Sequence, residues 1–125
     1  MSFEEAELIK KRAEAFLRNA KRLLEEKEWD LAAFNLEQYC QLVLKYKLLV
    51  EKGSYPRTHS LRSLIRLLGR PEALKLIEDE RYLHYIARLE EAYIVSRYIP
   101  YSYEEKEILD LYRFVSEVFK RYVDP

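Results

Sequence analysis

Arg97 is the side chain in this sequence best placed to hold a phosphate group, because tyrosines surround it. Tyr98 follows it directly, and Tyr101 and Tyr103 come shortly after the helix-breaking Pro100. A guanidinium donates paired hydrogen bonds to phosphate oxygens, and aromatic faces stack on nucleobases. The alternative is structural, since an arginine can also cap the carbonyl groups at a helix end while tyrosines pack against a core. Side-chain chemistry leaves both interpretations open.

His59 and Lys45 are the other candidates for such a site. His59 lies in the segment 56–61, PRTHSL, where a polar side chain commonly bonds to a helix N-terminus. Its pKa near neutrality would also suit proton transfer. Lys45 lies within an apolar helix, from which it can reach the cleft of Arg97 or extend its ammonium group to solvent. In the binding interpretation Arg97 clamps a phosphate, Tyr98 stacks on a base and His59 donates a hydrogen bond.

Several kinds of catalytic site are excluded by the residues available. His59, His84 and Cys40 are scattered, whereas zinc sites use ligands in close pairs. With two glycines in 125 residues, the chain has neither a glycine-rich phosphate loop nor the strand-turn-helix setting of a serine nucleophile. We therefore assign no metal, no cofactor and no catalytic residue.

Apolar periodicity and helix-end signals divide the chain into helices. Long helices are predicted over about 3–26, 30–52, 80–97 and 102–122, with Asp30 as a cap for the second. A short helix is predicted from Thr58 or Ser60 to Gly69, with one or two further turns after Pro71. The predicted fold is all-α, an up-and-down four-helix bundle with an extra short helix, in a single domain of residues 1–125.

The predicted helix from Trp29 to Val50 is apolar on two faces. The first face carries Leu31, Phe34, Gln38, Leu42, Lys45 and Leu49, and the second carries Leu36, Tyr39, Val43, Tyr46 and Val50. A helix with two apolar faces is normally covered on both of them. We expect one face to serve the core, and the second face, with parts of the last two helices, to form a homodimer.

The charge balance bears on partners and location. The 22 basic and 22 acidic residues cancel, so any contact with RNA must come from a local patch. The chain has no run of about 20 uncharged apolar residues, no signal-peptide pattern and a single cysteine, and we expect a cytoplasmic protein without a membrane partner. Charged residues reach 35%, against two Asn and two Gln, a balance typical of thermophilic proteins.

Three separated pieces of the sequence together resemble the HEPN family, which is named for higher eukaryotes, prokaryotes and nucleotide binding. They are the run Gln38, Leu42, Leu44, Lys45 and Leu48 in a long apolar helix, the PRTHSL helix start, and Arg97-Tyr98 at a later helix end. The resemblance covers nearly the whole chain. It implies an HEPN-like bundle that binds a nucleotide or RNA as a homodimer. It also implies a small nucleotidyltransferase as partner, in a two-part module of the toxin-antitoxin kind.

The same resemblance bears on catalysis. Ribonuclease members of the family carry an arginine separated by four to six residues from a histidine, whereas Ser102, Tyr103 and Glu104 occupy those places here. The loss of this acid-base group favours a binding protein over an enzyme. One alternative is an active ribonuclease toxin, with Arg97 stabilising charge and His59 or a tyrosine replacing the histidine. Another is a purely structural helical interaction module.

Overall fold

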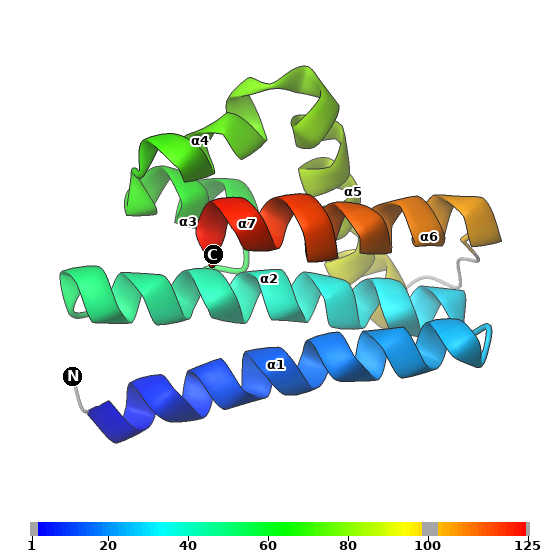
Figure 1. Cartoon of the computed structure of the whole chain (residues 1–125), viewed down its shortest axis with the longest axis horizontal. Coiled ribbons are helices and arrows are strands. Elements are labelled where there is room, and N and C mark those ends of the chain that lie inside the picture. Colours follow the sequence, from blue (N-terminus) through cyan, green and yellow to red (C-terminus); the bar gives the residue numbers. More distant parts are fainter. Residues whose placement is uncertain (1–2, 99–102, 125) are drawn as a thin grey trace.

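The computed structural model describes residues 3–98 and 103–124, and for residues 96–98 it describes the backbone alone (Figure 1). Every regular element in these ranges is helical. The helices are α1 (Phe3–Glu25), α2 (Trp29–Lys52), α3 (Leu61–Leu68), α4 (Pro71–Glu78), α5 (Glu80–Tyr98), α6 (Glu105–Arg113), the π-helix η1 (Phe114–Phe119) and α7 (Lys120–Val123). The predicted all-α bundle is confirmed, with two short helices, α3 and α4, where one short helix and a few turns were expected.

The two longest helices form the base of the molecule. In Figure 1, α1 and α2 lie side by side and run in opposite directions, while α6, η1 and α7 form one continuous rod along the other side of α2. The buried side of α1 carries mostly alanines, which let the two helices approach closely: Ala6, Ala13, Ala20 and Leu23. Asn19 Nδ2 also donates to Asn35 Oδ1 across the pair, at 2.9 Å.

Local signals in the sequence set most of the helix ends. Gly53 and Gly69 adopt φ values of 86° and 68°, and their N–H groups bond back to Leu49 and Ile65 at the ends of α2 and α3. This left-handed conformation is the one that glycine tolerates best. Asp30 proves to lie in the first turn of α2 rather than at its cap. In that position its negative charge interacts favourably with the positive end of the helix dipole.

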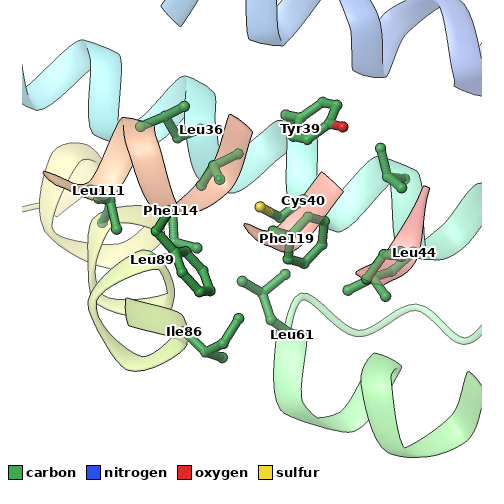
Figure 2. Packing of buried hydrophobic residues seen from close by; sticks show 14 of the residues in the cluster. Leu36, Tyr39, Cys40, Leu44, Leu61, Ile86, Leu89, Leu111, Phe114 and Phe119 are labelled. Carbon is green, nitrogen blue, oxygen red and sulfur yellow. The ribbon is translucent and has the colours of Figure 1, made fainter. Parts of the chain in front are cut away.

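Helix α2 lies at the centre of the core, and the second of its two predicted faces is the more buried one. Leu36, Tyr39 and Val43 of the second face are at most 4% exposed, because this face packs inside the chain's own core. Figure 2 shows Leu36 and Tyr39 among core residues from the other helices. The first face is the more open one, and it includes Leu31 at 45% exposure. Most of the predicted partner face is therefore buried within the chain, and only its end is open, with Val50 at 48% exposure.

Candidate functional site

The open face of α2 meets α5 and the loop 53–60 at a stack of aromatic rings. The imidazole of the exposed His59 lies against the ring of Tyr93, with 4.5 Å between centroids and 19° between planes. Tyr93 is in turn stacked near Phe34 of α2, with 6.4 Å between centroids. Three rings from three parts of the chain thus form a partly exposed aromatic surface, which we call the His59–Tyr93 platform.

The loop that carries His59 is tied to α5 by one carboxylate. Glu90 accepts hydrogen bonds from the Ser60 hydroxyl at 3.2 Å, the Arg62 backbone N–H at 3.2 Å and Arg62 Nε at 2.8 Å. Ser60 is also the N-cap of α3, since its hydroxyl oxygen accepts from the N–H of Ser63 at 3.2 Å. The capping role considered for His59 therefore belongs to Ser60, and the imidazole remains available at the surface.

A row of polar side chains runs along α2 beside this loop. Glu37 accepts from Gln38 Nε2 at 2.7 Å and from Gln41 Nε2 at 2.8 Å. Lys45 Nζ continues the row by donating to Gln41 Oε1 at 2.9 Å. The ammonium group of Lys45 also lies 5.7 Å from the ring centroid of Tyr55, in the loop 53–60. Lys45 is thus held in a network of α2 rather than extended freely into solvent.

Burial changes the ionisation of this row. The Glu37 side chain is fully buried, which raises the pKa of its carboxyl group from 4.5 to about 7, and the charge of Glu90 adds to the rise. Burial likewise lowers the pKa of Lys45, an effect that the charge of Glu37 partly offsets.

The predicted pair Arg97 and Tyr98 lies at the end of α5, and their side chains fall outside the described residues. Their positions in the helix are nevertheless informative. Position 97 comes four residues after Tyr93, one turn further along the same side of α5. Tyr101 lies outside the described residues too, whereas Tyr103 is 3% exposed and is a packing residue. The structure therefore brings His59 to the turn of α5 that precedes position 97.

The sequence reasoning missed Tyr93, Glu90 and Glu37. None of these three residues is singled out by its type, since tyrosine and glutamate are frequent throughout the chain. A signal was present, because Glu90 and Tyr93 precede Arg97 by seven and four residues, a spacing that puts all three on one helix side. Nothing comparable marks Glu37, since its burial depends on how α2 is covered by other helices.

Within 3–98 and 103–124, no three side chains among His, Cys, Asp and Glu are grouped so that they could hold a metal ion. No helix in the same ranges has both the length and the apolar character required to cross a bilayer.

Comparison with known families gives one match. A family model described as the HEPN domain matches residues 6–124, nearly the whole chain. No curated protein and no solved structure matches the sequence.

Proposed function

The chain belongs to the HEPN domain family, and from this we propose that it is a homodimeric nucleotide- or RNA-binding protein. The binding residues in this proposal are Arg97, Tyr98, His59 and Lys45, with Tyr93 added from the structure. The observation that carries it is the stack of His59 on Tyr93, one helical turn before position 97. Together these residues would offer a guanidinium for phosphate and aromatic surfaces for a base.

Binding without cleavage fits the chemistry of the site. No histidine occupies positions 102–104, so the acid-base group expected from the ribonuclease members is missing. General acid-base catalysis contributes about 10²–10⁴-fold to such reactions, and its loss would leave little activity. We propose that the protein holds its ligand and has no enzymatic activity of its own.

The open face of α2 supports a dimer in which two such sites lie close together. A shallow groove of about 740 Å³ runs between α1 and α2, where Phe16 and Leu42 are partly exposed beside Gln38. Leu31 and Phe34 extend this face of α2, and Phe34 is the ring of the His59–Tyr93 platform that α2 contributes. A second copy placed on this face would cover the exposed apolar side chains and bring its own platform alongside the first.

The proposed partner is a small nucleotidyltransferase, as the resemblance to two-part toxin-antitoxin modules implies. In such a module this chain would be the half that binds the substrate. Its zero formal net charge leaves recognition of the partner to local contacts rather than to a long-range field.

A ribonuclease remains the second candidate, because one observation favours it. His59 lies near α5 one turn before position 97, so its imidazole is a possible replacement for the missing histidine. In that case Arg97 would stabilise the developing charge and His59 would transfer the proton. A purely structural helical module is the third candidate, and it requires no ligand at all.

Calorimetric titration with mononucleotides and short single-stranded RNA tests the proposal. Replacing Arg97→Ala should cost about 1.5–3 kcal/mol of binding free energy, the scale of a charged hydrogen bond, and Tyr98→Ala about 1–3 kcal/mol through lost stacking. The exposed Lys52→Ala at the far end of α2 serves as the control and should change little. Equal losses at all three positions, or no binding by the parent protein, would support the structural module.

A further inference from the structure

A second hollow lies on the opposite side of α2 from the polar row. It has a volume of about 380 Å³ and is bordered by α1, α2 and the rod of α6, η1 and α7. Tyr39 lines it, two positions along α2 from Glu37, and a two-residue step turns a helix by about 200°. This hollow is thus separate from the His59–Tyr93 platform and is not used in the proposed function.

The hydroxyl of Tyr39 has no hydrogen-bond partner. Among the described residues, it is the only buried side-chain nitrogen or oxygen atom that lacks a hydrogen-bond partner. Tyr39 itself is 2% exposed. Phe119 packs edge-on against the ring with 6.2 Å between centroids, and Figure 2 shows Tyr39 on the side of the core nearest α1. Burial is the main cause that raises the pKa of Tyr39, with smaller contributions from Cys40, Asp124 and Glu14, so the hydroxyl keeps its proton as a donor. A buried donor without an acceptor destabilises a fold, which makes it informative when it lines a cavity.

The charged side chains around the hollow are mainly cationic once their pairing is considered. Arg18, Lys21 and Lys120 line it, and none of them has an ion pair or side-chain hydrogen bond within the described part of the chain. Of the two carboxylates there, Asp124 is held by Lys47 at 3.6 Å between Nζ and Oδ1. Glu14 is the remaining acid, so three cations face one carboxylate without a salt bridge.

The π-helix η1 brings two of the lining residues into register. The N–H of Lys120 bonds to the carbonyl of Val115, five residues back, and the Ser116 hydroxyl donates to the carbonyl of Tyr112 at 2.9 Å. In a regular α-helix Tyr112 and Lys120 would point about 80° apart, and the residue added by the π turn brings them nearly into line. Both residues line the hollow. Short π segments occur frequently at functional sites.

We propose that this hollow binds a small oxyanion of the phosphate type, as free phosphate or as the phosphate group of a monoester. One oxygen accepts the hydrogen bond of the Tyr39 hydroxyl at the floor, and Arg18, Lys21 and Lys120 balance the charge at the rim. Movement of these exposed side chains opens the way to the hydroxyl. The ligand supplies the acceptor that the protein itself does not provide for Tyr39.

Titration with inorganic phosphate at constant ionic strength, followed by calorimetry and by ¹H–¹⁵N NMR, tests this site. Ribose 5-phosphate compared with ribose then distinguishes a monoester from free phosphate. We expect saturable binding with amide shifts around Tyr39 and Lys120, weakened about 10-fold or more by Tyr39→Phe, which keeps the ring. Lys21→Ala and Lys120→Ala, both at exposed positions that the fold tolerates, should weaken it as well.

Two controls separate this inference from the proposed function. Lys52→Ala removes an exposed lysine elsewhere, and Arg97→Ala removes the proposed nucleotide contact, so phosphate binding at the hollow should survive both. The inference is overturned if no saturation is seen up to about 10 mM phosphate, if Tyr39→Phe and the lysine variants bind like the parent, or if only Arg97→Ala abolishes binding.

Discussion

The imidazole of His59 lies nearly parallel to the phenol ring of Tyr93, with 4.5 Å between the two ring centroids. This contact joins the loop after α2 to α5, one turn before position 97. Stacking uses the faces of the two rings and leaves the imidazole nitrogens at the edge, where they can still donate or accept hydrogen bonds. The contact with Tyr93 therefore holds the exposed His59 in place and leaves its ring nitrogens available to a ligand.

Glu90 holds the His59 loop against α5, so its removal should loosen the site. Glu90→Ala breaks three hydrogen bonds to Ser60 and Arg62, and we expect a loss of about 1–3 kcal/mol in the free energy of unfolding, together with weaker RNA binding. Urea denaturation and calorimetry measure the two effects. Glu91→Ala, which breaks only a surface contact with Arg88, is the matched control. Equal stability of the two variants would contradict the anchoring role.

Glu37 should make the stability of the fold depend on pH in an unusual direction. The folded protein keeps this proton up to about pH 7, while the unfolded chain releases it near pH 4.5. Between these values the folded state binds more protons, so the free energy of unfolding contributed by this group falls as pH rises, by about 3 kcal/mol in total. Above pH 7 it adds no further change.

Replacing Glu37→Gln isolates that effect. The glutamine side chain is uncharged at every pH, so the variant should lack the decline between pH 4.5 and 7 that the parent shows. Urea denaturation of both proteins across pH 4–8 gives the difference curve, in which contributions from other groups cancel. If the stabilities of the parent and the variant change in parallel over the whole pH range, the conclusion that Glu37 is buried and titrates near pH 7 is wrong.

The proposed dimer uses the open face of α2, so charge placed there should separate the copies. We expect the parent protein to sediment as a dimer at tens of micromolar, about the range in which ordinary dimers persist, and Leu31→Glu to sediment as a folded monomer. Leu31 is 45% exposed, so the charge should not disturb the core. Leu109→Glu, at a similarly exposed leucine of α6, should leave the dimer intact. A parent protein that sediments as a monomer would refute the dimer.

The protein should not cut single-stranded RNA at rates typical of HEPN ribonucleases. Positions 102–104 lack the histidine that would transfer a proton, and gel analysis of a labelled RNA measures the remaining rate. Robust cleavage that disappears in both Arg97→Ala and His59→Ala would establish the ribonuclease alternative. Cleavage that persists in both variants would instead indicate a contaminating enzyme.

The helices could be predicted from the sequence because their ends are set by local signals. Gly53, Gly69 and Pro71 stop or start helices through backbone conformations that depend on the residue itself. The choice between the two faces of α2 could not be predicted in this way. Both stripes are apolar at helical spacing, and only the packing of α1 and η1 decides that Tyr39 is covered while Leu31 stays open.

The candidate site was predictable in part for the same reason. His59 was noticed for its chemistry, whereas its contact with Tyr93 joins residues 34 positions apart and depends on tertiary structure. The π turn in the last helix could not be predicted either. The segment 102–122 has the periodicity of an ordinary helix, with no proline or glycine to mark a change. The buried state of Glu37 belongs to the same class of tertiary effects.

NMR titration of the ¹⁵N-labelled protein with a short single-stranded RNA tests the central claim most directly. The proposed function predicts amide shifts concentrated at His59, Tyr93 and Arg97, saturating with RNA and absent from the Arg97→Ala variant, with the RNA recovered uncut. Shifts confined to other surfaces, or no shifts at RNA concentrations well above that of the protein, would contradict it.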